Sequence, residues 1–332
     1  MNKKLFVLLI FAMGLLFTAC GSSEGTIEIE KKIRLGEQDW DSARFHCSVA
    51  KYIIEKGYDY DVELVSGSSN NLNVAVNIND VDVLMEMWTD NYPEYESSIE
   101  AGTMVKLGVN FDDNMQGLYV PRYVVEGDES RGIKAVAPDL KTVDDLNKYP
   151  ELFPDPADDS KGMIVNAPPS WIVSQIMEEK ISLYDLDEKY NLFSPGATSS
   201  LFASLTGAYE AGEPWVGYMW EPTWISGGYD LIRLTENPFE EALWEDGYKC
   251  DFKAIPVEVI GSKMFVENHG EVADFLRNYH TSAEITAKAL MYMKENDASI
   301  DEAAHKFLEE NTEMWSTWLN EEAKNKVLES LK

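Results

Sequence analysis

The chain has 332 residues and carries 59 acidic side chains against 28 basic ones, for a formal net charge of −31 at pH 7. This length is enough for two domains with a sizeable core. The acidic balance excludes nucleic acid as a partner and argues against direct binding to anionic membrane surfaces. The three cysteines and four histidines form no CxxC or HExxH pattern, so we expect no metal site and no cofactor.

The amino terminus predicts export and a lipid anchor. A basic leader with two lysines precedes an apolar run, Leu5–Ala19, which is too short to span a membrane comfortably. The run ends at Cys20, and Phe17-Thr18-Ala19-Cys20 resembles the bacterial lipobox, although that pattern prefers Leu where Phe17 stands. We therefore expect a signal peptide at 1–19, an acylated Cys20, a flexible tether at 20–25, and an extracytoplasmic, membrane-anchored protein of a bacterium. An ordinary signal peptide with a chance cysteine is the alternative.

Loss of residues 1–19 would remove two lysines and no acid, which leaves a formal charge of about −33 on the remaining chain. A surface of that charge repels anionic lipid, so only an anchor such as an acylated Cys20 would hold the protein at a membrane.

The first third of the chain alternates between strand and helix patterns. The predicted elements are a strand over 32–35, a helix over 42–56, a strand over 61–66, a helix near 70, a strand over 82–88 and a helix over 92–100. Strands interleaved with helices predict an α/β fold with a mostly parallel sheet.

A second α/β unit follows over about 126–254, with a strand over 162–165 and helices over 170–180 and 199–211. Two extended runs, 117–125 and 255–265, are candidate crossings between lobes, and 271–332 has an almost wholly helical pattern. We therefore predict a discontinuous first lobe over 26–120 and 258–332, and a second lobe over 121–257.

Four of the nine tryptophans share one topological place, at or just past the end of a predicted strand. They are Trp40, Trp88, Trp171 and Trp220. Most tryptophans belong to cores. In an open α/β sheet, however, ligands bind outside the carboxyl ends of the strands, so four tryptophans there predict one aromatic binding site.

An indole face suits a cation that has no N–H group to satisfy, such as a quaternary ammonium. Each face contributes about 0.5 to 2 kcal/mol. A preorganised cage of three or four faces could therefore support micromolar affinity. Sugar is the competing ligand, since Trp also stacks on pyranose rings.

The segment Trp220-Glu221-Pro222-Thr223-Trp224 resembles the family of substrate-binding proteins of ABC transporters for glycine betaine, proline betaine, choline and related compatible solutes, and the similarity extends over most of the chain. This resemblance implies a two-lobed, periplasmic-binding-protein-like fold of type II whose hinge closes around the ligand. It also implies an ABC permease as partner, a monomeric state and a role in osmoprotection. Carried over residue by residue, it places Trp88, Trp171 and Trp220 in the aromatic cage, with Trp40 close by.

The chain departs from the family pattern at two places. Many relatives have His where this chain has Thr223, and many have glycines where it has Ala167-Pro168-Pro169-Ser170. The prolines remove backbone donors, which leaves the amides of Ser170, Trp171 and Ile172, together with Thr223, as candidate partners of a ligand carboxylate. Glycine betaine, choline and other methylated amines therefore all stay open.

Two further readings remain from the residues alone. One is a receptor for another small solute, such as a sugar or an amino acid. The other is a secreted carbohydrate-active enzyme that uses Glu86 and Glu221, since both flank tryptophans of the predicted site. We expect no catalysis, because Glu221 stands at a strand end before Pro222 and Glu86 is expected to pack or to face a ligand without doing chemistry. The chain also has no GxSxG, P-loop or GxGxxG motif. Whether Cys47 and Cys250 form a disulfide is left open.

Overall fold

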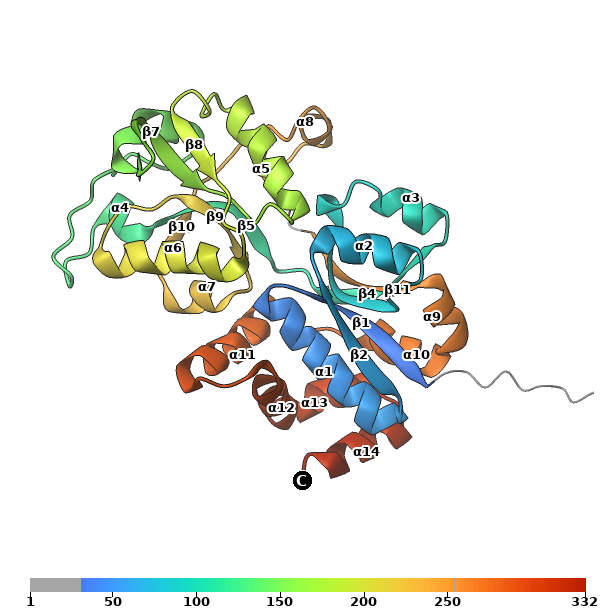
Figure 1. The fold of residues 1–332 in the computed structure, drawn as a ribbon. Helices are drawn as coiled ribbons and strands as arrows, with labels where there is room; N and C mark the ends of the chain where they lie inside the picture. Colours follow the sequence, from blue (N-terminus) through green and yellow to red (C-terminus); the bar gives the residue numbers. More distant parts are fainter. Residues whose placement is uncertain (1–30, 254) are drawn as a thin grey trace, which may run out of the picture. The chain divides into compact units, whose positions relative to one another are not determined.

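The computed structural model describes residues 31–253 and 255–332. The predicted signal peptide, Cys20 and the tether lie outside the described residues. Within them the chain forms two β-sheets, each flanked by helices (Figure 1). The helices of this described part include none that is both long and apolar enough to cross a lipid bilayer.

The first sheet has five strands in the order β2-β1-β3-β11-β4. Their bounds are β1 Lys32–Gln38, β2 Asp61–Gly67, β3 Val83–Trp88, β4 Met104–Phe111 and β11 Val257–Ser262. Strands β1, β2 and β3 pair in parallel, and β11 runs antiparallel between β3 and β4. Strand β11 follows all the strands of the second sheet along the chain, so the first sheet is built from two separate stretches of sequence.

Helices cover both faces of the first sheet, and we call the sheet with these helices the first lobe. Val83 and Met85 of β3 join one apolar cluster and Leu84 joins another, as the alternation of side chains along a strand requires. The helices and 3₁₀ turns are α1 Asp41–Tyr58, α2 Ser69–Asn77, η1 Thr89–Asn91, α3 Tyr95–Glu100, α9 Lys263–Asn268, α10 Gly270–Asn278, α11 Ala283–Asn296, α12 Ile300–Glu310, α13 Thr312–Trp315, η4 Ser316–Trp318 and α14 Glu321–Ser330.

The second sheet has six strands, with the order β10-β5-β9-β7-β6 and with β8 paired to β7. Their bounds are β5 Met115–Pro121, β6 Pro154–Asp155, β7 Asp158–Val165, β8 Tyr190–Phe193, β9 Gly217–Glu221 and β10 Leu231–Arg233. The parallel centre is β8-β7-β9. A Cβ on Gly217 would lie 2.6 Å from the carbonyl oxygen of Val165, so only glycine lets β9 start this close to β7.

We call the second sheet with its helices the second lobe. Its helices and turns are α4 Arg122–Glu126, η2 Asp144–Lys148, η3 Pro150–Leu152, α5 Ile172–Leu183, α6 Thr198–Ala211, α7 Trp224–Gly228 and α8 Glu241–Glu245. Helix α6 is followed by Gly212, which caps its carboxyl end. The φ of Gly212 is 73°, in the left-handed region that suits glycine at a helix end. Side chains from β5, β7, β9, α5 and α6 share one apolar core.

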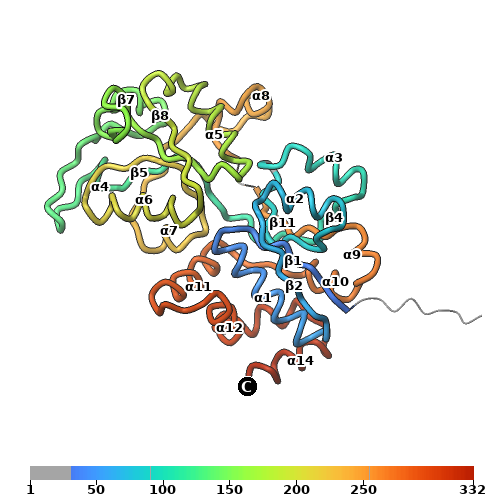
Figure 2. The backbone as a smooth tube through the Cα atoms, in the orientation of Figure 1, coloured from blue at the N-terminus to red at the C-terminus, as the bar shows by residue number. Residues whose placement is uncertain are grey.

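The chain crosses between the sheets twice (Figure 2). The first crossing lies between Phe111 and Met115, because β5 already belongs to the second sheet. Residues 122–125, expected as extended chain, instead continue from β5 as helix α4. The return crossing leads into β11, and the Asn114 side chain donates a hydrogen bond to the carbonyl of Ile255, which ties the two crossings together.

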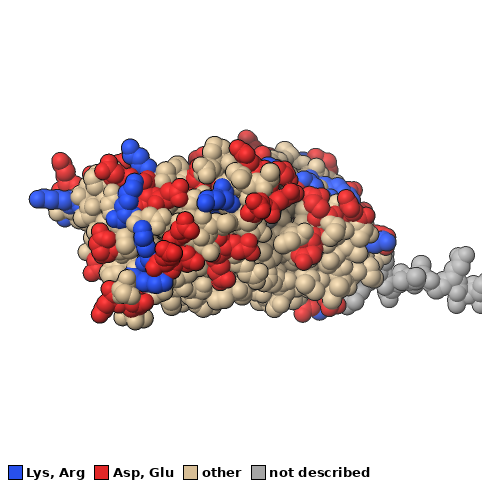
Figure 3. Space-filling view, turned by 90° about the horizontal axis from the view of Figure 1, so that it is seen from above, with Lys and Arg blue, Asp and Glu red and all other residues tan. Residues whose placement is uncertain are grey.

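The acidic side chains are spread over the surface. In the view of Figure 3 they are interleaved with fewer lysines and arginines. Several of the basic residues pair with an acid one helical turn away, as Lys288 does with Glu284. Exposed pairs of this kind contribute little stability each, so the acids form a solvated surface and the site chemistry has to be sought in buried groups.

Candidate ligand-binding site

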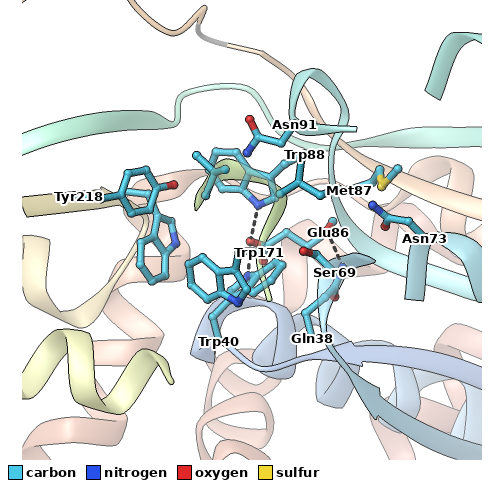
Figure 4. A pocket seen from close by; sticks show the side chains of 13 residues that line it. Gln38, Trp40, Ser69, Asn73, Glu86, Met87, Trp88, Asn91, Trp171 and Tyr218 are labelled. Carbon is cyan, nitrogen blue, oxygen red and sulfur yellow. Dashed lines mark hydrogen bonds between the residues drawn. The ribbon is translucent and has the colours of Figure 1, made fainter. Parts of the chain in front are cut away.

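The four predicted tryptophans line one pocket between the two sheets (Figure 4). Trp88 is the last residue of β3 and Trp220 lies in β9, one residue before its end. Trp40 and Trp171 are the residues that immediately precede α1 and α5. The fold therefore brings together four side chains that are far apart in the sequence, each at or next to the end of a strand or the start of a helix.

The indoles meet nearly at right angles. The ring centroid of Trp171 is 5.0 Å from that of Trp40 at an interplanar angle of 71°, and 5.0 Å from that of Trp220 at 79°. Edge-to-face contact is a favourable arrangement for aromatic pairs. Trp171 thus forms the wall between a first-lobe ring and a second-lobe ring.

A buried carboxylate holds the first-lobe half of the pocket. Oε1 of Glu86, on β3, accepts hydrogen bonds from Nε1 of Trp40 at 2.7 Å, from Nε1 of Trp88 at 3.0 Å and from the Ser42 hydroxyl at 3.1 Å. Hydrogen bonds to an ionised acceptor are stronger than neutral ones. One carboxylate oxygen therefore fixes the orientation of two indoles.

Burial raises the pKa of Glu86 to about 7, although its three hydrogen-bond donors act in the opposite direction. Its second oxygen, Oε2, is buried and has no hydrogen-bond partner among the described residues. An ionised carboxylate costs free energy when it is buried with one oxygen that has no hydrogen-bond donor. A bound ligand that supplies this donor would remove the cost.

Aromatic packing holds the second-lobe half of the pocket. The Trp220 ring stacks on Phe202 at a centroid distance of 5.5 Å and on Tyr218 at 6.0 Å. Trp171 differs, because its Nε1 donates to Oδ1 of Asp39, in the first lobe, at 2.8 Å. This bond connects the two lobes at the edge of the pocket.

Polar side chains from the first lobe complete the lining of the pocket. They are Gln38, Ser69, Asn73 and Asn91. The side-chain oxygens of Gln38, Asn73 and Asn91 are buried without a partner among the described residues, while Nε2 of Gln38 donates to the backbone oxygen of Glu86 at 2.9 Å. The pocket therefore has an aromatic part and, beside it, a polar part.

The pocket is narrow in this structure, with about 40 Å³ of free volume. By the same measure a water molecule needs about 10 to 15 Å³, so the free space corresponds to about three to four water molecules. The walls come from both sheets, so a separation of the lobes would widen the pocket.

The structure does not bring all the predicted residues to this pocket. Ile172 lines it together with Val173, both in the first turn of α5. Ser170 is exposed and is not part of the lining. Thr223 is buried, and its hydroxyl accepts a hydrogen bond from the backbone amide of Ser226 at 3.1 Å, as the cap of α7. Thr223 lines a separate cavity together with Glu221.

Several residues that line the pocket are not among those expected from the sequence. Gln38 ends β1 and Asn91 follows β3 within a short turn, so the rule that singled out the tryptophans could have found both. Tyr218 precedes Trp220 by two residues in β9, so strand alternation places both side chains on one face of the sheet. Phe202 does not line the pocket, and its contact with Trp220 depends on how α6 packs on the sheet. Cys47 and Cys250 are both buried and free.

Solved structures of substrate-binding proteins share this fold. The glycine/betaine/L-proline-binding protein ProX from Borrelia burgdorferi has a TM-score of 0.72 at 18% identity, covering 89% of this chain and 99% of that one. A choline-binding protein of an ABC transporter, in complex with choline, has a TM-score of 0.73 at 15% identity, with 91% and 99% covered. Lactococcal OpuAC, closed on glycine betaine, has a TM-score of 0.68 at 17% identity, with 87% and 99% covered.

These likenesses confirm the predicted two-lobed α/β fold. The similar proteins are named for glycine betaine in two cases and for choline in one, so the fold alone does not distinguish these ligands. Residues 31–310 match the family model of the substrate-binding domain of the ABC-type glycine betaine transport system. The predicted resemblance is thereby confirmed, and the chain belongs to this family of substrate-binding domains.

Proposed function

We propose that this protein captures a quaternary ammonium compound in the pocket formed by Trp40, Trp88, Trp171 and Trp220 and passes it, unaltered, to the permease of an ABC importer. Membership of the family supports the transport role. The arrangement of the four indoles supports the ligand class, and it is the observation on which the proposal depends.

Three of the four indoles have their N–H groups engaged by carboxylates. Trp40 and Trp88 donate to Glu86, and Trp171 donates to Asp39. What these rings then offer a ligand is their faces, which carry negative quadrupole density and attract cations. A trimethylammonium group has no N–H donor of its own, so it loses no hydrogen bond when it enters such a site. An N–H group that pointed at an indole face would find no strong hydrogen-bond acceptor there.

A ligand carboxylate has a candidate partner in the first turn of α5. Ile172 and Val173 line the pocket at the amino end of this helix, where backbone N–H groups are free of intrahelical partners and favour anions. Glycine betaine would therefore place its ammonium group among the indoles and its carboxylate at α5.

The location that fits this function is the outer surface of a bacterial cytoplasmic membrane. We propose that Cys20 carries the lipid and that residues 20–25 act as the tether to a monomeric receptor. A Cys20→Ser variant should be released into the medium or periplasm with its ligand affinity unchanged, because the described pocket is lined by residues between Gln38 and Trp220. Membrane retention of that variant would contradict the anchor.

We further propose that the protein is a receptor without catalytic activity. Glu86 and Glu221, the carboxylates considered for glycoside cleavage, line different cavities, and cleavage requires two carboxylates that flank one bond. Incubation with a bound solute should therefore leave its NMR spectrum unchanged. Turnover of a glycoside that is lost in both Glu86→Gln and Glu221→Gln would establish the enzyme instead.

Calorimetric titration with a panel of solutes tests the proposal. The panel is glycine betaine, proline betaine, choline, carnitine and trimethylamine oxide, with a hexose and a free amino acid as controls. At least one methylated ammonium compound should bind and should raise the thermal transition by mass action. Binding of the hexose or the amino acid alone would overturn the ligand class.

A further inference from the structure

We infer that Glu86 makes the pocket selective for net-cationic ammonium alcohols of the choline type over zwitterionic betaines. This inference rests on the proposed function, because it assigns the charge class of the ligand in the same pocket. Glu86 touches no reacting group and acts through charge and hydrogen bonding. We therefore describe it as a specificity-determining residue.

The first support is the position of the charge. Glu86 lines the pocket, and its Oε1 is bonded to the N–H edges of Trp40 and Trp88. The carboxylate therefore lies beside the two rings whose faces are proposed to receive the ammonium group. A buried charge in this position interacts with the ligand at low effective dielectric. It attracts the ammonium group of every candidate ligand, but it repels a carboxylate that the same ligand carries.

The second support is the unsatisfied acceptor. Oε2 of Glu86 is buried with no partner among the described residues. An alcohol can donate a hydrogen bond to it, whereas a carboxylate has no donor at neutral pH. The buried side-chain oxygen of Gln38 adds a second unpaired acceptor in the pocket lining. The polar part of the pocket thus matches a ligand tail that carries a hydroxyl group.

The third support is that the pocket offers a ligand carboxylate few binding partners. The Thr223 hydroxyl is used as the cap of α7 and lines another cavity, and Ser170 is exposed outside the pocket. The first turn of α5 remains. Its partial charge is smaller than the full charge of Glu86, so the balance of the pocket favours a ligand of net positive charge.

The test compares choline with glycine betaine on the full chain and on the Glu86→Gln variant. In the variant the amide oxygen can still accept from Trp40, Trp88 and Ser42, while an N–H₂ donor replaces Oε2. Glu37→Gln is the matched control, because it removes one negative charge from the same sheet at a side chain that pairs with Ser66 and does not line the pocket.

Wild-type protein should bind choline at least about tenfold more tightly than glycine betaine. Glu86→Gln should reduce this ratio by about tenfold or more and leave the betaine affinity within a few-fold, and retained betaine binding also shows that the variant is folded. Glu37→Gln should keep the wild-type ratio. Choline binding near neutral pH should release a proton in wild type, seen as a dependence of the binding heat on the buffer, and not in Glu86→Gln.

Three outcomes would overturn the inference: tighter binding of betaine by wild type, an unchanged ratio in Glu86→Gln, or equal loss of both ligands in that variant. In each of these the protein still binds a quaternary ammonium compound, so the proposed function stands. Failure of wild type to bind any member of the panel would instead remove the proposed function, and this inference with it.

Discussion

The two halves of the aromatic pocket are held in place by different interactions. In the first lobe, Trp40 and Trp88 are both bonded through their N–H groups to one buried carboxylate, Glu86. In the second lobe, Trp220 is held by ring stacking on Phe202 and on Tyr218. The first half is therefore fixed by hydrogen bonds to a group that can titrate, and the second half by apolar contact that does not depend on pH.

The two halves thus differ in whether the group that orients the rings also carries a charge. Stacking fixes a ring only as well as the surrounding volume is filled. A carboxylate also fixes the ring, and it adds a negative charge beside the cation site, at the cost of burying that charge. The first lobe thus contributes both affinity and a dependence on pH, whereas the second lobe contributes affinity alone.

The largest expected effect is the loss of a ring from either half. Trp88→Ala and Trp220→Ala should each weaken binding of the preferred ligand by about 1 to 3 kcal/mol, because each removes one face from the cation. Calorimetric titration measures this loss. Trp244→Ala is the control, since Trp244 lies in α8 against Tyr248 and Phe252 and does not line the pocket. Unchanged affinity in both cage variants would remove the cage.

The next largest effect on affinity should come from a change of pH, which changes the charge of the first half of the pocket only. Burial raises the pKa of Glu86 to about 7, and a bound cation favours the ionised form. Below that pKa, binding must release a proton, so choline affinity should fall by up to about tenfold per pH unit on acidification and level off above it.

Cys47 and Tyr279 interact electrostatically with Glu86, but burial raises their pKa values. His46 bonds to Tyr279, and burial lowers its pKa to about 3, so none of these three groups should titrate in this range. Titrations from about pH 8 to about pH 6 on wild type and Glu86→Gln measure the effect. We expect a flat profile for Glu86→Gln, and an equally flat wild-type profile would contradict the difference between the halves.

A smaller effect on affinity is expected from Phe202→Ala, which removes one stacking partner of Trp220. Phe202 is 5% exposed, so the variant should lose about 3 to 5 kcal/mol of unfolding free energy. Its affinity should fall by about three- to tenfold at every pH, because the ring loses packing and no charge changes. Denaturant unfolding and titration at two pH values measure both quantities. An affinity loss confined to low pH would contradict this account of the second half.

The smallest effect on affinity should come from weakening the hydrogen bond between Trp171 and Asp39, which connects the lobes. Asp39→Asn leaves an oxygen that can still accept from Nε1 of Trp171, but the acceptor is no longer charged. We expect affinity to fall by about two- to fivefold. Asp61→Asn, at an exposed position at the start of β2 and outside the pocket lining, is the control and should leave affinity unchanged. A loss as large as that of a cage tryptophan would mean that Asp39 contacts the ligand itself.

Local sequence patterns predicted most of the elements that carry the site. The helix expected over 42–56 is α1, Asp41–Tyr58, and the helix expected over 199–211 is α6, Thr198–Ala211. These segments have clear apolar periodicity and helix ends. The failure at 122–125 has a physical reason, because Pro121 ends a strand and its fixed φ also suits the residue before a helix.

The placement of the tryptophans was predictable, whereas the role of Glu86 was not. Ligands bind outside the carboxyl ends of strands in α/β sheets, so Trp88 of the first sheet and Trp220 of the second could be grouped as candidate pocket residues from the chain alone. Glu86 is one of 59 acidic residues, and only the register between β3 and the start of α1 brings its carboxylate to two indoles at once. Thr223 is expected from the sequence as a candidate partner of a ligand carboxylate. Its position next to Trp224 does not indicate that its hydroxyl caps α7.

The most direct test of the account compares choline with its neutral carbon isostere, in which a tert-butyl group replaces the trimethylammonium group. The two molecules have nearly the same shape, so apolar burial is matched and only the charge differs. If the indole faces and Glu86 recognise a cation, calorimetric titration should give at least about a hundredfold tighter binding of choline. Equal affinities would contradict the account, because the pocket would then select for shape and apolar surface alone.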